Sequence, residues 1–284
     1  MGIFSDILLT VDFDRTLTAP DSTIPQRNFE AIRYFMENGG AFTVNTGRSV
    51  PMYSRLLNEV EVNAPLLLYN GSAAYDRETG ELSLLRPIDM DMKETVLELL
   101  ELFPDLTVEV QGVKAHYNFI PDKKWDDFCA YNKCPCATAR PEDDLGPFLK
   151  FTLYGEFHDS TVPSLFVATP AEKARIDEAE GILLERYGDK VEVFRSATRL
   201  LDVHAKGVSK GGAARALQQR MGRAILICVG DAENDIPMLE AADFAYAPAD
   251  GLVADRFENV CNCGEGAVAD VIYKKIPEIL KKRA

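Results

Sequence analysis

Acidic residues stand in two places where they could do chemistry together. Asp12 and Asp14 directly follow a short apolar run, and residues two apart in an extended chain point to the same side. Asp231 and Asp235 follow a second apolar run and are four apart, which places them on one face of a starting helix. Carboxylates of this kind can hold Mg²⁺, and one of them can attack a phosphorus atom once charge is neutralised nearby.

Thr46 and Lys210 could complete a site for phosphoryl transfer. Thr46 ends a further apolar run, and Lys210 lies in GVSKGG at the expected start of a helix. A hydroxyl and an ammonium group could bind the oxygens of the transferring phosphoryl group. A second carboxyl beside the nucleophile could protonate the leaving oxygen. Lys206 is a nearby alternative for the part of Lys210.

The elements that must position these side chains follow the rhythm of a doubly wound, Rossmann-like α/β sheet. In such sheets ligands bind at the carboxyl ends of the strands, where these residues lie. A hairpin is expected at 73–85. Strands are predicted at 7–11, 41–44, 65–69, 224–229 and 244–247, with helices at 25–38, 52–58, 209–221 and 267–280.

A different pattern occupies the middle of the chain. Hairpins with helices between them predict an inserted α+β cap domain at 86–203, which leaves 1–85 and 204–284 as the catalytic core. The stretch 133–146 is expected to be a loop. The cap helices are predicted at 90–103, 125–131 and 170–187, and its strands at 106–110, 115–119, 148–154, 164–168, 191–194 and 200–203.

The composition of the chain indicates which kinds of molecule the protein is expected to bind. The 284 residues carry a formal net charge of −14 with a sequence pI of about 4.8, so most of the surface repels nucleic acid and anionic membranes. The sequence shows neither an apolar run of about 18 residues nor a signal peptide. We expect a cytoplasmic protein that acts on small molecules, and the sequence does not indicate its oligomeric state.

Two close cysteine pairs raise the alternative of a zinc site. Cys134 and Cys136 are separated by one residue, as are Cys261 and Cys263, and the pairs fall in different predicted domains. Zinc sites usually space their cysteines by two to four residues. Reduced thiols are the expected state. His116, His158 and His204 are isolated in sequence and are expected to be structural.

Four motifs in order carry a resemblance to a known family. DFDRT at 12–16, NTGR at 45–48, GVSKG at 207–211 and GDAEND at 230–235 resemble the motifs of haloacid dehalogenase (HAD) phosphatases. The large insertion between the second and third motifs is similar to that of the Cof-like, type IIB branch. The resemblance implies a Mg²⁺-dependent phosphatase that hydrolyses small phosphorylated metabolites, above all sugar phosphates, through an aspartyl-phosphate.

The resemblance also implies a role for each matching residue. Asp12 would be the nucleophile and Asp14 the general acid and base. Position 15 departs from the pattern, because it is Arg15 where many relatives carry glycine. The metal would be held by Asp12, the backbone carbonyl of Asp14, Asp231 and Asp235. The phosphoryl group or the rest of the substrate would be bound by Thr46, Gly47, Arg48, Asn70, Lys210 and Asn234.

The sequence also allows other interpretations of the same residues. Asp231 could serve only as a helix cap and Asp235 as a partner of the helix dipole. Arg48 and Asn70 could be structural. A phosphomutase of the same superfamily would share the core motifs but would need extra arginines in the cap to hold a bisphosphate. A phosphometabolite-binding protein without catalysis is a further alternative. The arginines of the predicted cap include Arg140, Arg175, Arg186, Arg195 and Arg199.

Overall fold

The computed structural model describes residues 2–54 and 59–283, which form two compact units. The first unit takes its described residues from Met1–Thr46, Glu59–Leu84 and Ser209–Ala284. The second takes them from Gly47–Asn58 and Leu85–Val208. None of the helices in the described ranges is both long enough and apolar enough to span a membrane.

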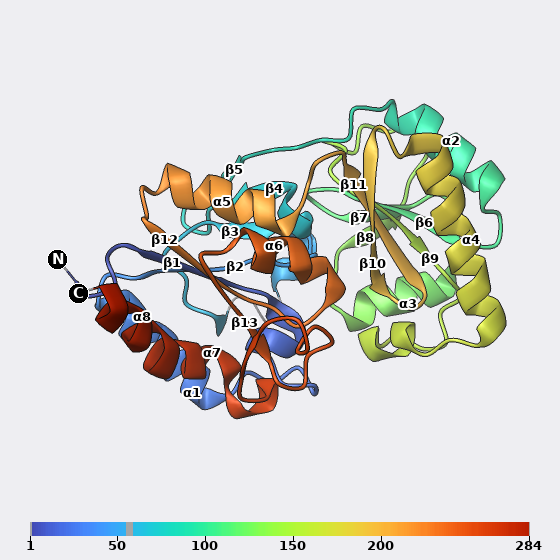
Figure 1. The fold of residues 1–284 in the computed structure, drawn as a ribbon. Coiled ribbons are helices and arrows are strands. Elements are labelled where there is room, and N and C mark those ends of the chain that lie inside the picture. Colours follow the sequence, from blue (N-terminus) through green and yellow to red (C-terminus); the bar gives the residue numbers. More distant parts are fainter. Residues whose placement is uncertain (1, 55–58, 284) are drawn as a thin grey trace. The chain divides into compact units, whose positions relative to one another are not determined.

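A five-stranded parallel sheet forms the centre of the first unit (Figure 1). Its strand order is β14-β13-β12-β1-β2. Every residue of β1, β2 and β12 is buried, as expected for strands covered on both faces. The predicted doubly wound α/β core is therefore confirmed. The strands are β1 (Ile7–Val11), β2 (Ala41–Val44), β12 (Ile225–Val229), β13 (Phe244–Pro248) and β14 (Glu258–Val260).

Helices cover both faces of this sheet. On one side lie α5 (Lys210–Arg220) and α6 (Ile236–Ala241), and on the other α1 (Gln26–Glu37) with the C-terminal helical segments (Figure 1). These segments run from α7 (Ala267–Asp270) to α8 (Ile276–Arg283) through one intervening helical turn. The expected hairpin at 73–85 forms part of a small antiparallel sheet. That sheet contains β3 (Leu66–Leu68), β4 (Ala73–Tyr75) and β5 (Leu82–Ser83).

The second unit is built on a six-stranded sheet of order β10-β11-β9-β6-β7-β8. Neighbouring strands are antiparallel except for β7 and β8, which run parallel. This confirms the predicted α+β insertion as a separate sheet. Its strands are β6 (Thr107–Gln111), β7 (His116–Asn118), β8 (Cys136–Thr138), β9 (Phe151–Tyr154), β10 (Val191–Ala197) and β11 (Leu200–Ala205). Its helices are α2 (Met92–Leu102), α3 (Lys123–Tyr131) and α4 (Pro170–Tyr187).

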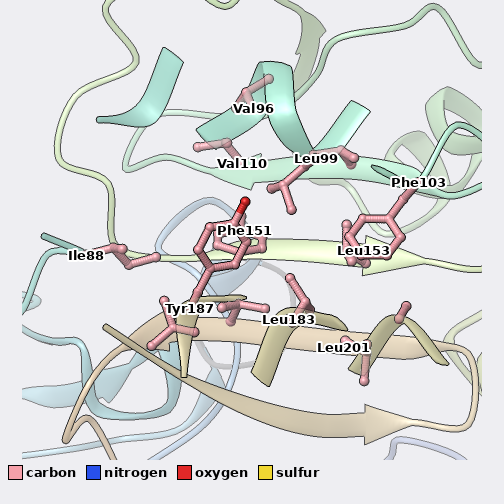
Figure 2. Packing of buried hydrophobic residues seen from close by; sticks show 14 of the residues in the cluster. Ile88, Val96, Leu99, Phe103, Val110, Phe151, Leu153, Leu183, Tyr187 and Leu201 are labelled. Atoms are coloured by element: carbon pink, nitrogen blue, oxygen red, sulfur yellow. The ribbon is translucent and has the colours of Figure 1, made fainter. Parts of the chain in front are cut away.

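One face of this second sheet packs against α2 and α4. Figure 2 shows Leu99 from α2 and Leu183 from α4 pointing toward Phe151, Leu153 and Leu201 on the strands. All five side chains are fully buried. Because side chains alternate across a strand, the residues between these apolar positions point to the opposite face. That opposite face is polar.

The structure differs from the sequence prediction at four places. The strand predicted at 164–168 is a 3₁₀ turn, Val162–Phe166, whose second residue is a proline that cannot donate to a strand ladder. The loop predicted at 133–146 contains β8, which pairs at the edge of the sheet. The strand β14 was not predicted, because Glu-Asn-Val has no apolar run. Of the helix predicted at 52–58, the described part is a 3₁₀ turn, Pro51–Ser54, and 55–58 lie outside the described residues.

The segment after Thr46 also differs from the predicted domain division. The sequence assigned it to the core, but its described residues group with the second unit. The carbonyl oxygen of Gly47 accepts a hydrogen bond from Lys150 Nζ at 3.1 Å, and that partner lies 103 residues along the chain. Local patterning cannot report such a contact. The remaining domain boundaries stay predictions.

Candidate active site

The parallel register of the first sheet brings three motifs to one edge. Val11 pairs with Val229 on one side and with Val44 on the other. The chain beyond each strand end therefore leaves from the same level, about 5 Å from its neighbour. Backbone hydrogen bonds extend this alignment by one residue, from Asp12 N to Val229 O at 2.9 Å and from Asn45 N to Val11 O at 2.8 Å.

Three of the predicted carboxylates meet at this edge. Asp12, Asp231 and Asp235 each offer an oxygen, and these oxygens lie within 4.8 Å of one another. Their exposed fractions are 7%, 3% and 0%. Asp235 Oδ2 accepts from the backbone N–H groups of Asp231 at 3.0 Å and of Ala232 at 3.1 Å. Gly230 makes this possible, because a Cβ there would lie 2.5 Å from the Cβ of Asp235.

Lys210 joins two of these carboxylates. Its Nζ lies 2.6 Å from Asp12 Oδ1 and 2.6 Å from Asp235 Oδ1, and its side chain is 1% exposed. The lysine is the first residue of α5, and Ser209 caps the helix by accepting from the N–H of Gly212 at 3.0 Å. A Cβ at Gly211 would lie 2.0 Å from Pro237 O, so this glycine allows α5 to pack against α6. The glycine of the motif thus helps to place the lysine.

Burial and crowding raise the pKa values of two of these carboxylates. Burial, and then the charge of Asp235, raises the pKa of Asp12 well above its usual value. Burial and Asp235 likewise raise the pKa of Asp231 to about 7. Burial acts to lower the pKa of Lys210, but the two neighbouring carboxylates outweigh burial and raise it. The site therefore has more negative charge than one lysine neutralises.

Two residues that support the site were not among the predicted site residues. Thr16 Oγ1 donates to Asp231 Oδ1 at 2.9 Å, across 215 residues of sequence. Asn45 Nδ2 donates to Lys210 O at 2.9 Å. Both are buried, and both lie inside the motifs DFDRT and NTGR, so motif membership was the signal available for them.

Backbone contacts, burial and domain membership describe the remaining predicted site residues. Thr46 is buried, its N–H donates to Leu67 O at 2.9 Å, and its carbonyl accepts from Asn70 N at 3.0 Å. Thr46 and Asn70 are thus neighbours through their backbones. Asp14 and Asn234 are half-buried on the turns that follow β1 and β12. Gly47 and Arg48 belong to the second unit. The catalytic or binding role of each of these residues stays a prediction.

The unusual Arg15 occupies a left-handed backbone conformation. Its φ is 59° and its ψ is 10°, and its side chain is exposed. Non-glycine residues adopt this conformation at a cost, whereas a glycine would adopt it without strain. The turn nonetheless forms, with Arg15 N donating to Thr18 Oγ1 at 3.1 Å.

Replacing Arg15 with glycine is expected to raise the free energy of unfolding by about 0.5–1 kcal/mol, because it relieves this backbone strain. Urea denaturation of wild type, Arg15→Gly and Arg15→Ala would measure it. The alanine variant removes the same charge and keeps the Cβ, so it is expected to show no such gain. An equal gain for both variants would attribute the effect to charge instead.

Neither the alternative lysine nor the cysteines join the site. Lys206 is half exposed and pairs with Glu192 at 3.4 Å within the second unit. Within the described ranges the metal-capable cluster consists of the three aspartates and contains no cysteine. All six cysteines are free thiols. Burial raises the pKa of Cys263 to about 11, and its Sγ donates to Asp250 Oδ2 at 3.2 Å.

The donor set suits a hard divalent cation. Three carboxylate oxygens converge and are nearly enclosed, and burial together with the charge of Asp235 raises the pKa values of Asp12 and Asp231. Mg²⁺ prefers oxygen ligands and binds through one or two carboxylates together with substrate oxygens and water. The residues present therefore fit such an ion.

Comparison with known proteins agrees with the fold. The family model of the haloacid dehalogenase-like hydrolases matches residues 9–254. An HMP-PP phosphatase of Klebsiella pneumoniae is 26% identical over 82% of this chain and 80% of its own length. A 5-amino-6-(5-phospho-D-ribitylamino)uracil phosphatase of Bacillus subtilis is 22% identical over 90% of each chain. The solved structure of a HAD subclass IIB sugar phosphatase superposes with a TM-score of 0.72 over 96% of this chain and 98% of that one, at 17% identity.

The chain belongs to the haloacid dehalogenase-like hydrolase family. Within that family it is a phosphatase, a phosphoric monoester hydrolase.

Proposed function

We propose that this protein hydrolyses sugar phosphates or similar polyol phosphates through an aspartyl-phosphate on Asp12, with Mg²⁺ as its cofactor. The observation that carries the proposal is the contact of Lys210 Nζ with both Asp12 and Asp235 at 2.6 Å, beside Asp231. A nucleophile, a cation and two further carboxylates are thereby combined at the carboxyl ends of parallel strands. The polyol phosphate in the name of the Bacillus subtilis relative supports the substrate class.

The residues divide the reaction into two steps. In the first, an Asp12 carboxylate oxygen attacks phosphorus, the bond from phosphorus to the ester oxygen breaks, and Asp14 gives its proton to that leaving oxygen. In the second, Asp14 takes a proton from water, whose oxygen attacks phosphorus and releases Asp12 and inorganic phosphate. Lys210 and the hydroxyl of Thr46 hold phosphoryl oxygens during both steps.

The metal would be held by Asp12, Asp231 and Asp235, with the backbone carbonyl of Asp14 as a further ligand. When bound, the ion supplies positive charge that neutralises the carboxylates and the phosphoryl oxygens. Thr16 keeps Asp231 oriented through its hydroxyl bond, and the N–H groups of Asp231 and Ala232 do the same for Asp235.

Affinity for Mg²⁺ is expected to fall as the pH is lowered through 7. The pKa of Asp231 is raised to about 7 in the metal-free protein, so below this pH a proton occupies a carboxylate that the ion needs. The apparent association constant should drop by at least about tenfold from pH 8 to pH 6, because each pH unit below a pKa is a factor of ten. Isothermal titration calorimetry would measure it on EDTA-treated protein. A constant affinity over this range would contradict the shifted carboxylate.

The phosphomutase alternative needs arginines in the cap that are available to hold a second phosphate. Five of the six arginines at 86–203 already contact a carboxylate of the same unit. Arg140 lies 2.8 Å from Asp143, and Arg175 lies 2.7 Å from Asp105. The other three arginines pair with acidic residues on α2 and α4, namely Arg186 with Glu98, Arg195 with Asp177 and Glu180, and Arg199 with Glu172. Binding of a second phosphate by these arginines would break the ion pairs. The arrangement therefore favours hydrolysis over the mutase reaction.

A panel of phosphorylated metabolites tests the proposal. It should contain hexose, pentose and polyol phosphates, a nucleotide and p-nitrophenyl phosphate, each with Mg²⁺ and with EDTA. The expected result is release of inorganic phosphate with Mg²⁺ only, fastest from a sugar or polyol phosphate. An isomerised sugar phosphate without free phosphate would favour the mutase, and a preferred nucleotide would overturn the substrate class.

A further inference from the structure

The placement of the Lys210 ammonium group depends on the first turn of α5, which carries it. A lysine side chain is flexible, so its position follows from the backbone below it and from the partners at its end. That backbone is packed closely on two sides. A Cβ at Gly71 would lie 2.5 Å from Ser209 O, and a Cβ at Gly211 would lie 2.0 Å from Pro237 O. The start of α5 therefore lies directly against two neighbouring segments of the first unit.

Asn45, which follows β2, supplies a third support for this turn. Its Nδ2 donates to Lys210 O at 2.9 Å and to Met238 Sδ at 3.4 Å, so one amide group joins the first residue of α5 to α6. Asp235 directly precedes α6. The amide therefore links the two helices that hold the opposite ends of the ion pair between Lys210 and Asp235.

The backbone of Asn45 connects this support to the predicted nucleophile. Its N–H donates to Val11 O at 2.8 Å, and Val11 directly precedes Asp12. All of these residues belong to the first unit. One buried residue thus joins the strand that leads to Asp12 with the helix that carries Lys210.

The amide of Asn45 is not needed to complete the hydrogen bonding of the fold. Lys210 is the first residue of α5, so the i to i+4 pattern of the helix already provides a donor for its carbonyl oxygen. Asn45 is fully buried, and its Oδ1 has no hydrogen-bond partner among the residues that the structure describes. An unpaired buried acceptor destabilises a fold, and an apolar side chain of the same size would avoid that penalty. The contribution of the amide therefore lies in its bond to Lys210.

We propose that Asn45 is a positioning residue that holds the first turn of α5 in place and thereby keeps the Lys210 ammonium group beside Asp12. The inference rests on the proposed function. Lys210 Nζ is shared between Asp12 and Asp235 at 2.6 Å each, so a small shift of the helix start changes how the ammonium group meets the phosphoryl oxygens. Asn45 acts through Lys210 and takes no part in the bond changes itself.

A double-mutant cycle on the full chain tests the proposal. Wild type, Asn45→Leu, Lys210→Met and the double variant would be assayed with p-nitrophenyl phosphate and Mg²⁺. Asn45→Leu is expected to lower kcat about tenfold and to leave KM within about twofold, because Lys210 neutralises charge that develops in the chemical step. In the Lys210→Met background the same change should alter kcat less than about twofold, because the group that Asn45 positions is already gone. Asn45→Ala carries the same cycle if Asn45→Leu does not fold.

Urea denaturation separates positioning from a structural role. The midpoint of Asn45→Leu is expected to be no lower than that of wild type, because the variant removes an unpaired buried acceptor. Asn63→Leu is the matched control at the opposite end of β2. The Asn63 amide donates to Gly40 O at 2.9 Å and accepts from Phe42 N at 2.8 Å, so both of its ends are paired. This control should lower the midpoint and leave kcat within about twofold of wild type.

Two results would overturn the inference and leave the phosphatase proposal intact. An equal loss of kcat by Asn45→Leu in the Lys210→Met background would show that Asn45 acts through another group, such as the adjacent Thr46. A fall of the urea midpoint in Asn45→Leu as large as that in Asn63→Leu would make Asn45 a structural residue. A wild-type protein without phosphatase activity would overturn both proposals.

Discussion

Asp12→Asn is expected to lower kcat for p-nitrophenyl phosphate by at least about 10³-fold, because an amide oxygen cannot form the acyl-phosphate. The residue directly follows a buried strand, and its carboxylate contacts Lys210 at 2.6 Å. The loss should be in kcat, since the attack belongs to the chemical step. Steady-state kinetics with saturating Mg²⁺ would measure it. Labelled phosphate from the substrate should remain on wild-type protein after an acid quench and be missing from the variant.

Asp21→Asn is a suitable control for this experiment. Asp21 lies nine residues further on and is exposed, and its carboxylate only closes a local turn by accepting from Thr23 N at 3.0 Å. Its replacement removes the same charge and should leave kcat within about twofold of wild type. If Asp12→Asn left Mg²⁺-dependent hydrolysis unchanged, the nucleophile and the proposed mechanism would both be wrong.

Lys210→Met is expected to lower kcat/KM by about 10²–10³-fold, the usual loss when one charged donor to a reacting oxygen is removed. The same change leaves Asp12 and Asp235 buried without their shared cation. Breaking a buried ion pair from one side costs about 3 kcal/mol of unfolding free energy. Chemical denaturation in EDTA should show this loss, and Mg²⁺ should reduce it, because the ion brings positive charge back to the carboxylates.

Lys206→Met separates this effect from a general loss of surface charge. Lys206 lies four residues earlier in the chain and is half exposed beside Glu192. Its replacement should change activity less than about twofold and stability less than about 0.5 kcal/mol. A larger loss of activity at Lys206 than at Lys210 would reverse the assignment of the cation. Equal stability of Lys210→Met in EDTA and in Mg²⁺ would argue against a metal at the three aspartates.

Local patterning was sufficient for the elements that have strong local signals. Apolar runs such as Ile7–Val11 become strands buried on both faces, because a parallel sheet with helices on each side leaves no exposed positions in them. The elements without a strong local signal were predicted wrongly. The strand β8 is half exposed at a sheet edge, and the turn Val162–Phe166 is apolar without being extended. Their structure depends on neighbours that are distant in sequence.

The order and spacing of the motifs by themselves determined the fold class, the insertion and the set of acidic residues at the strand ends, because parallel strands leave their loops at a common edge. Only the tertiary structure decided that Lys210 bridges Asp12 and Asp235, that Thr16 holds Asp231, and that the residues around Arg48 are held by the sheet of the second unit. These contacts join groups up to 215 residues apart. Charge pairing and desolvation favour these contacts in the folded chain. The periodicity of residue types along the sequence does not indicate either effect.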